Sequence, residues 1–301
     1  MRFLCAAHED IVMATSTVRE NDLAAWIQSC VREFAASKEN TLGNGEPAWA
    51  QPLLGFSRGD DPLYAEFKRD IGPFYWTPQD AFSRAFPSSY VAGAELSVIS
   101  WILPQTDTTK AESRKEKNYP SERWARSRKY GEEFNVKLRN HVVAVLAATG
   151  VSAVAPVNHP LWAQRASEHY GPASVWSERH AAYVAGLGTF GLCDGLITAA
   201  GKAMRCGSVV ARVQIPPSLR PYTDHHAYCL FFARGTCGKC IERCPAGAIT
   251  KAGHNKQKCA AYEESTTTPY VLSTFGLEAY GCGLCQTGVP CESGIPVRES
   301  E

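Results

Sequence analysis

Hydrophobic residues between positions 22 and 213 follow two different periods, which together predict helices alternating with strands. From 22 to 35 they recur every three or four positions behind Asn21-Asp22, which predicts a capped amphipathic helix. The run LSVISWIL at 96–103 is continuously apolar and stops at a proline, so it predicts a buried strand. A long helix is expected over about 121–149, because Gly150 can end it, and a strand near 151–155 should follow.

Three further segments complete the predicted order of elements. Thr77 and Pro78 are a typical helix start, with the hydroxyl as cap and the proline at the first helical position. Ser177 caps the short helical segment ERHAAYVA, which stops at Gly186. Strands are expected at 196–198 and 208–213, joined by a turn that contains Gly201. This mixture predicts an α/β or α+β fold, and the pattern leaves the strand order open.

A proline-rich stretch at 215–221 separates two regions of different composition. All seven tryptophans lie before residue 177, whereas eight of the twelve cysteines lie after residue 228. Because prolines at this density exclude a helix or a central strand, we place a domain boundary there. The predicted organisation is a poorly ordered extension at 1–20, a first domain at 21–215 and a second domain at 222–301.

Charge and hydropathy exclude several classes of protein. The formal net charge is +1, so no global basic field attracts nucleic acid or anionic lipid. The longest stretch of low polarity, at 142–157, is shorter than the ~20 residues that a membrane-spanning helix needs. The first residues lack the apolar core of a signal peptide, so we expect a cytoplasmic protein without a membrane partner. In a reducing compartment, twelve cysteines indicate metal binding rather than disulfides.

The strongest chemical signal is the run C-x2-C-x3-C-P formed by Cys237, Cys240 and Cys244 with the proline that follows. This spacing is the latter part of the bacterial ferredoxin motif, in which the last cysteine ligates the other of two clusters. Cys282 and Cys285 supply a second C-x2-C pair. Three more cysteines, Cys229, Cys259 and Cys291, raise the total to eight, which is the number that two [4Fe–4S] clusters require.

The cysteine pairs also allow an alternative, a zinc site, with His225 and His226 as additional ligands. Eight thiols exceed one tetrahedral site, and the C-P ending is typical of clusters, so iron–sulfur binding is favoured. The remaining cysteines have no partner at ligand spacing and are expected to be small buried hydrophobic residues. They are Cys5, Cys30, Cys193 and Cys206.

The segment at 186–191 matches the dinucleotide-binding pattern G-x-G-x-x-G literally. That fold requires a strand before the glycines and a helix after them, and here the order is reversed. The glycines either let the backbone pass close to a flat group or form a tight loop. We assign Gly186, Leu187 and Gly188 as candidate cofactor-binding residues.

Four parts of the chain carry a resemblance to a known family: ERHAAYVAGLGTFG at 178–191, the cysteine run at 237–249, Cys259, and YGCGLCQ at 280–286. Together they resemble the epoxyqueuosine reductase family, which is related to reductive dehalogenases. The resemblance implies a nitroreductase-like, cobalamin-binding domain followed by a ferredoxin domain with two clusters. It implies that one cluster is held by Cys229, Cys237, Cys240 and Cys291, and the other by Cys244, Cys259, Cys282 and Cys285.

The chain departs from the family pattern at several positions. Arg234 stands where the family has its first cluster cysteine, and Pro290 precedes the last cysteine instead of following it. Pro172 occupies the position of the family's catalytic aspartate, six residues before Glu178. The chain stops ten residues after Cys291, without the helical repeats of the tRNA-acting members. We therefore expect cluster binding to be retained and tRNA not to be the substrate.

Two hypotheses about function follow. In the first, a flavodoxin- or ferredoxin-type donor reduces the clusters, which reduce a corrinoid or a small-molecule substrate, with His169, Tyr170 or His180 as substitute proton donor. Glu178 is equally plausible as a site residue or as a first-turn helix acid. In the second, the chain is a non-catalytic electron-transfer or corrinoid-handling protein that serves a partner protein.

One basic stretch, at 110–139, is a candidate contact for an acidic partner or RNA. It holds ten lysines and arginines against five glutamates. Because these charges alternate and aromatic residues are sparse, a solvated helix flank is favoured.

Overall fold

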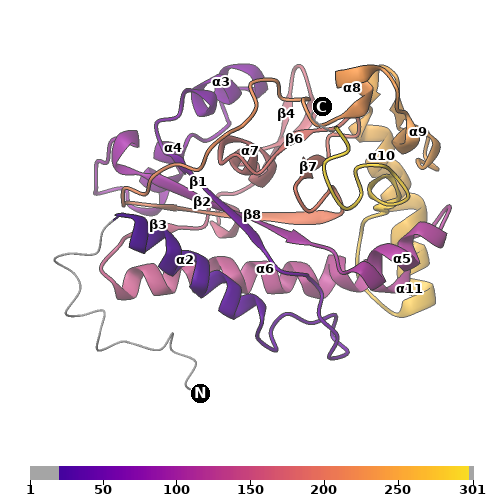
Figure 1. Cartoon of the computed structure of the whole chain (residues 1–301), viewed down its shortest axis with the longest axis horizontal. Coiled ribbons are helices and arrows are strands. Elements are labelled where there is room, and N and C mark those ends of the chain that lie inside the picture. Colours follow the sequence, from indigo (N-terminus) through magenta and orange to yellow (C-terminus); the bar gives the residue numbers. More distant parts are fainter. Residues whose placement is uncertain (1–19, 298–301) are drawn as a thin grey trace.

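The computed structural model describes residues 20–297 and shows the predicted mixture of helices and strands (Figure 1). The predicted extension at 1–20 lies outside these residues except for Glu20, which begins the first helix. No helix among the described residues is long and apolar enough to cross a membrane.

The centre of the fold is an antiparallel four-stranded sheet with the order β1-β2-β8-β3. Its strands are β1 (Leu53–Arg58), β2 (Ser97–Pro104), β8 (Met204–Ala211) and β3 (Ala153–Val154). The apolar run predicted at 96–103 is β2, and each of its residues is buried. Strand β8 begins four residues before the predicted 208, because Met204 and Arg205 continue the ladder opposite the end of β2.

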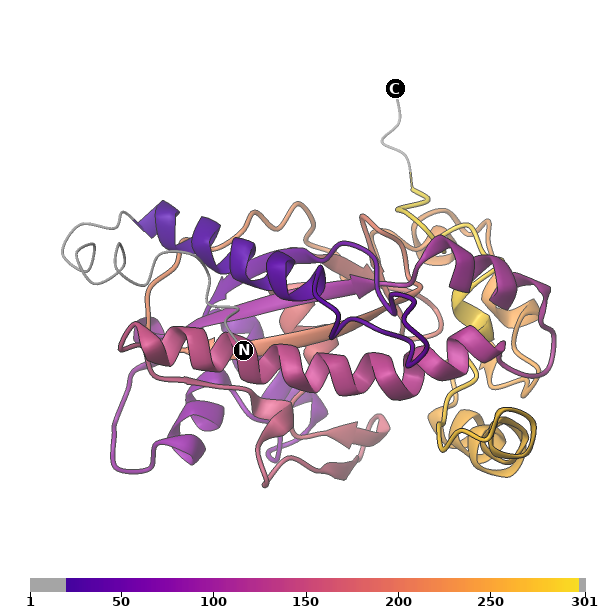
Figure 2. The same cartoon turned by 90° about the horizontal axis from the view of Figure 1, so that it is seen from below.

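Helices cover both faces of this sheet, which explains why β2 is apolar throughout. Ile99 and Trp101 pack against α2 (Glu20–Ala35) and α6 (Glu122–Ala148). Val98 and Ile102 alternate with them and face the other core, where α3 (Pro62–Ile71), α4 (Pro78–Ala85) and α7 (Glu178–Val184) lie. Figures 1 and 2 show the two helical layers on opposite sides of the sheet.

The predicted helix boundaries follow the capping chemistry. The Thr77 side chain accepts a hydrogen bond from the Asp80 amide and begins α4, and Ser121 does the same for the Trp124 amide in α6. Gly150 follows α6 with φ +81°, a conformation that suits glycine. Ser177 caps α7, as predicted.

The middle of the chain forms two small two-stranded ribbons. One pairs β4 (Gln164–Ser167) with β5 (Gly171–Ser174), and the other pairs β6 (Gly188–Phe190) with β7 (Leu196–Thr198). Strand β7 is the one predicted at 196–198. The β4–β5 ribbon was not predicted, since its largely exposed residues lack an apolar alternation.

The region after residue 221 consists of short elements gathered at one end of the sheet (Figure 1). They are α8 (Leu230–Arg234), α9 (Lys239–Glu242), β9 (Ile249–Thr250), β10 (Gly253–His254), α10 (Lys256–Tyr262) and α11 (Thr268–Phe275). A π-helical segment joins α10 to α11 over Glu263–Thr267, and 3-10 turns lie at Gly93–Glu95, Pro156–Asn158 and Leu284–Gln286. The proline-rich stretch at 215–221 contains neither helix nor strand, as expected.

Arg243 connects the region after residue 221 to the region before it. Its guanidinium donates to the carbonyls of Leu284 and Thr287 on the C-terminal loop, at 3.2 and 3.0 Å. It also donates to the carbonyls of Ser113 and Glu116 at the end of α5 (Asp107–Lys115), at 3.0 and 2.6 Å. One side chain therefore holds three segments that lie far apart in the sequence.

We expect Arg243→Met to lower the free energy of unfolding by about 2–4 kcal/mol, because it leaves several partly buried carbonyls without a charged donor. Chemical denaturation measures this. The control Arg212→Met removes an exposed ion pair with Glu95 and should cost less than about 1 kcal/mol. Equal losses in the two variants would contradict the fastening role.

Candidate functional site

Four of the eight predicted ligand cysteines line one small cavity. Cys229 precedes α8, Cys237 and Cys240 lie at the start of α9, and Cys291 lies on the C-terminal loop. The wall between them is mostly apolar, with Leu192, Ile197, Leu230, Phe231, Val289 and Pro290 among its residues. The structure thus brings together the four thiols that the resemblance assigns to one cluster. We call them set one.

The other four predicted ligands lie next to this group. Burial raises the pKa of Cys282 to about 12, and the negative charges of Glu263, Cys259 and Cys244 add to the effect. Burial likewise raises the pKa of Cys259 to about 11, with Glu263 and Cys244 contributing. Cys285 is close enough to Cys282 to interact with it. These mutual effects place Cys244, Cys259, Cys282 and Cys285 in one neighbourhood, which we call set two.

Cys193 is the site residue that sequence reasoning missed. It is buried, as predicted, but it lies in one apolar cluster with Cys240 of set one, and Cys285 of set two packs against that cluster. Interactions with these two cysteines hold the pKa of Cys193 well below its usual value. Spacing gave no sign of this role, because Cys193 lies far before the cysteine-rich region.

The remaining cysteines outside the two sets were predicted to be buried, and those that the structure describes are buried. Cys30 and Cys206 are buried, and Cys206 belongs to the core around α7. Cys5 lies outside the described residues. The histidines of the zinc alternative have other contacts: His226 interacts with the Phe190 carbonyl through Nδ1 at 2.9 Å, and His225 is largely exposed.

Lys202 introduces a buried positive charge among these thiols. It is 3% exposed, and its Nζ donates to Cys193 Sγ at 3.2 Å. Burial opposes its charge, but the sulfurs of Cys193 and Cys291 raise the pKa of Lys202 above its ordinary value. Among the described residues, no carboxylate forms an ion pair with it. A buried ammonium needs a negative partner, and here only sulfur provides one.

This environment fits an anionic iron–sulfur group. Thiolates on apolar walls are the donors that such clusters use, and Lys202 balances their negative charge. Within residues 20–297, no three His, Cys, Asp or Glu side chains are arranged to hold a single metal ion. The fit therefore rests on the chemistry of the donors and of the cation beside them.

The candidate cofactor glycines pack against the protein's own backbone. A Cβ on Gly186, which has φ +77°, would lie 2.2 Å from the Leu219 carbonyl oxygen. A Cβ on Gly188 would lie 2.3 Å from the Ile197 carbonyl oxygen. Leu187 packs against the apolar core around α7. On the side where a Cβ would stand, the glycines thus form a tight loop, and cofactor binding by Gly186, Leu187 and Gly188 stays a prediction.

The segment also lacks the dinucleotide-binding context, as predicted. Helix α7 precedes these glycines and strand β6 follows, which is the reverse of the order that a pyrophosphate site needs.

The candidate proton donors do not converge on one point. Tyr170 donates to the Asp70 carboxylate at 2.6 Å, and this bond, with partial burial, raises the pKa of Tyr170 to about 12. His169 is exposed, as is Pro172 on strand β5. His180 is enclosed by aromatic rings, and burial lowers its pKa to about 3.

Glu178 belongs to a buried ion-pair network. Arg139 donates to it at 3.0 Å and to Glu132 at 3.2 Å. The second carboxylate oxygen of Glu178 is buried without a hydrogen-bond partner, and burial raises the pKa of this side chain. The network joins α6 to α7, which gives Glu178 a structural role.

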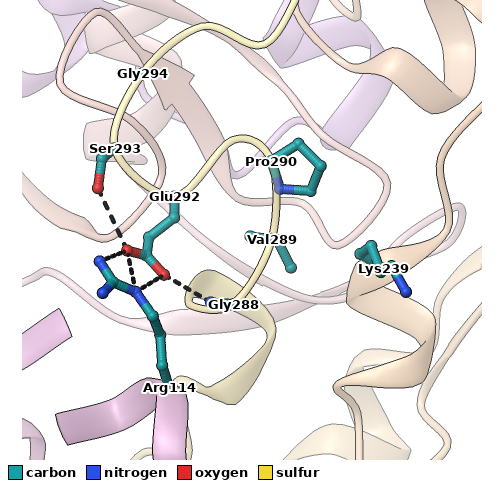
Figure 3. Close-up of a pocket in the computed structure, with 8 residues that line it drawn as sticks. All are labelled: Arg114, Lys239, Gly288, Val289, Pro290, Glu292, Ser293 and Gly294. Atoms are coloured by element: carbon teal, nitrogen blue, oxygen red, sulfur yellow. Dashed lines mark hydrogen bonds and ion pairs between the residues drawn. The ribbon is translucent and has the colours of Figure 1, made fainter. Parts of the chain in front are cut away.

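A larger, open pocket of about 560 Å³ lies beside the C-terminal loop (Figure 3). On its wall Arg114 donates to Glu292 at 2.8 Å, and the Gly288 amide donates to the same carboxylate at 2.6 Å. Lys239 lies on the opposite wall (Figure 3). The Arg114–Glu292 pair ties α5 to the residue directly after Cys291 and so fixes that ligand loop.

The sequence was compared with known proteins, and no family model matches it. Over 124 residues it is 32% identical to an epoxyqueuosine reductase of Bacillus anthracis, a match that covers 40% of this chain and 30% of that protein. Over 64 residues it is 38% identical to the epoxyqueuosine reductase of Bacillus subtilis, covering 20% and 17%. The similarity to epoxyqueuosine reductases is confirmed. The match thus spans less than a third of the length of either curated relative.

Solved structures show the same fold. An epoxyqueuosine reductase determined with an epoxyqueuosine-modified tRNA-Tyr stem loop aligns with a TM-score of 0.51 and 16% identity, over 93% of this chain and 68% of that chain. The catabolic reductive dehalogenase NpRdhA aligns with a TM-score of 0.50 and 14% identity, over 92% and 38%. The predicted α/β fold of this group is therefore confirmed.

We expect His180, which is partly buried among aromatic rings, to make stability depend on pH. Its pKa is depressed in the folded state, so unfolding takes up a proton, and stability falls as pH drops from about 6.5 towards 3. His180→Phe should reduce the slope of unfolding free energy against pH in this window by up to about 1.4 kcal/mol per pH unit.

Chemical denaturation at several pH values measures the slope. The matched control is Tyr75→Phe, which removes a polar group from the same aromatic cluster and no group that titrates in this window. An unchanged slope in His180→Phe would show that other groups cause the acid sensitivity.

Proposed function

We propose that this protein is an iron–sulfur oxidoreductase that uses two [4Fe–4S] clusters, one on each set of four cysteines. Its task is to take single electrons from a flavodoxin- or ferredoxin-type donor and deliver them to a small-molecule substrate. One-electron transfer at low potential is the chemistry that such clusters supply when bound.

The observation that carries the proposal is the gathering of set one around one apolar cavity with Lys202 on its wall. Thiols brought together from residues 229, 237, 240 and 291 repel one another when ionised, so a fold that collects them gains stability only with a positive partner. Lys202 supplies part of that charge, and iron supplies the rest. The similarity to epoxyqueuosine reductases supports the same conclusion.

Corrinoid binding is not part of the proposed function. Gly186 and Gly188 lie against protein backbone where a Cβ would stand, so no step of the proposed function is assigned to a corrinoid at 186–188. Corrinoid analysis of the anaerobically purified protein distinguishes the two hypotheses about function. Bound corrinoid with single-turnover reduction of a small substrate supports a reductase, and clusters without corrinoid support an electron carrier.

The carrier hypothesis is favoured by one specific observation. Each residue considered as a substitute for the missing acid at Pro172 is engaged elsewhere or exposed: Tyr170 is bonded to Asp70, and His180 is enclosed and uncharged. A reductase that protonates its substrate needs a donor at the reacting atom. We therefore keep the electron carrier as the second candidate function.

The basic stretch at 110–139 is engaged within the protein, which supports a substrate other than tRNA. Most of its charges form ion pairs or hydrogen bonds with residues of this chain: Arg114 with Glu292, Arg123 with Glu46 and Glu112, Arg126 with Glu122, Lys137 with Glu39, and Arg139 with Glu132 and Glu178. Paired cations contribute little to neutralising phosphates.

We expect about eight iron and eight sulfide per chain after anaerobic reconstitution, because two [4Fe–4S] clusters need eight thiolates. Metal and sulfide analysis with a visible spectrum measures this. Four iron per chain, or stoichiometric zinc in protein handled without oxygen, would contradict the proposal.

We expect Cys240→Ala and Cys244→Ala to damage different clusters, although three residues separate the two positions. Cys240 belongs to set one and Cys244 to set two, as the crossover of the ferredoxin motif requires. Paramagnetic resonance of the reduced variants identifies the surviving cluster. The same residual signal in both variants would refute this division of ligands.

We expect the protein not to replace a tRNA epoxyqueuosine reductase in a strain that lacks one. The reason is the internal pairing of its basic residues together with Pro172 at the acid position. Queuosine and epoxyqueuosine in digested tRNA are the readout, and a bacterial epoxyqueuosine reductase is the positive control. Restored queuosine at ordinary expression would show that tRNA is a substrate.

A further inference from the structure

Cys193 and Lys202 occupy the junction between the two sets of thiols. Cys193 shares a buried apolar cluster with Cys240 of set one, and Cys285 of set two packs against the same cluster. Lys202 Nζ donates to Cys193 Sγ at 3.2 Å and acts electrostatically on Cys240, Cys285 and Cys291. A ninth thiol thus lies in one cluster with members of both sets, an ammonium is bonded to it and lines the cavity of set one, and neither residue belongs to the ligand pattern.

The fold holds Lys202 in this position through its backbone as well as its side chain. The Lys202 amide donates to the Cys291 carbonyl at 2.8 Å. The preceding Gly201 has φ +86°, and a Cβ there would lie 2.1 Å from the Glu292 carbonyl oxygen. The side-chain stem passes Gly195, where a Cβ would lie 2.8 Å from Lys202 Cδ. The backbone approach at Gly201, which requires glycine, therefore leads Lys202 to the thiols.

A buried cation favours whichever state of its surroundings is more negative. In low dielectric its interaction with a charge a few ångströms away is many times stronger than in water. Reduction of an iron–sulfur cluster adds one electron, forms or breaks no bond, and makes the cluster more negative. A protonated Lys202 beside both sets stabilises the reduced form and raises the reduction potential.

We propose that Lys202, held by Cys193, is the shared counter-cation of the two cluster sites, and that Cys193 is its positioning residue rather than a ninth ligand. This inference rests on the proposed function, since it concerns clusters on the two sets. Through its charge, this one side chain influences the reduction potentials of both clusters.

Lys202→Met tests the proposal, because it keeps the stem of the side chain and removes the charge. In reconstituted protein titrated with dithionite and followed by paramagnetic resonance, we expect the equilibrium constant for reduction of at least one cluster to fall tenfold or more. For a one-electron couple this is a potential more negative by about 59 mV or more. Lys202→Arg, which keeps a positive charge, should recover most of the shift.

The matched control is Lys239→Met. Lys239 is next to Cys240 in sequence, but its side chain is 55% exposed and paired with Glu242 at 2.7 Å. Solvent and Glu242 screen its charge, so its removal should leave both potentials nearly unchanged. If Lys202→Met folds poorly, Lys202→Gln gives a neutral side chain that can still donate to sulfur, with the same expected direction.

Cys193→Ala separates positioning from ligation, because it removes the sulfur that accepts from Lys202. We expect this variant to keep about eight iron per chain and to shift the potential in the same direction as Lys202→Met. Loss of four iron would show that Cys193 is a ligand and would overturn its assigned role. Unchanged potentials in Lys202→Met with full iron would overturn the counter-cation. A wild-type protein that takes up no cluster would refute the proposed function itself, and the inference with it.

Discussion

A positive charge buried among thiols is the constraint on which the structure of this protein depends. Lys202 lies almost out of contact with water, and its hydrogen-bond partner is the sulfur of Cys193. Removing an ammonium from water costs several kcal/mol unless a negative group compensates. The lysine therefore favours ionised sulfur around it, and the collected thiols favour a protonated lysine.

The central sheet positions the lysine, and the cysteine-rich region supplies the thiols. Lys202 lies in the turn between β7 and β8, so it is fixed by the central sheet, whereas the thiols come from short elements with little core of their own. Arg243 and the Arg114–Glu292 pair fasten those elements to α5 (Figure 3). Arg114, which belongs to the basic stretch at 110–139, is thus used to assemble the protein.

The groups that would hold electrons are arranged differently from the groups that would donate protons. Sulfur and a buried cation are concentrated where electrons would be held. The residues considered as proton donors are dispersed, with Tyr170 bound to Asp70 and Glu178 bound to Arg139. A protein with this distribution is better equipped to store and pass electrons than to protonate a substrate of its own. The shared fold with epoxyqueuosine reductases leaves that choice open, because a fold carries many chemistries.

The sequence by itself determined the elements with strong local signals and the chemistry of the site. Buried β2 follows from its continuous apolar run, and α4 and α7 follow from their caps. Cysteine spacing pointed to an iron–sulfur motif, and the family resemblance implied the two sets of thiols. Only the tertiary structure decided that Cys193 and Lys202 join those sets, because each comes from a segment whose local pattern indicates an ordinary core or turn. Likewise, local pattern could not show that Gly186 and Gly188 face backbone, since contacts between distant segments arise only when the chain has folded.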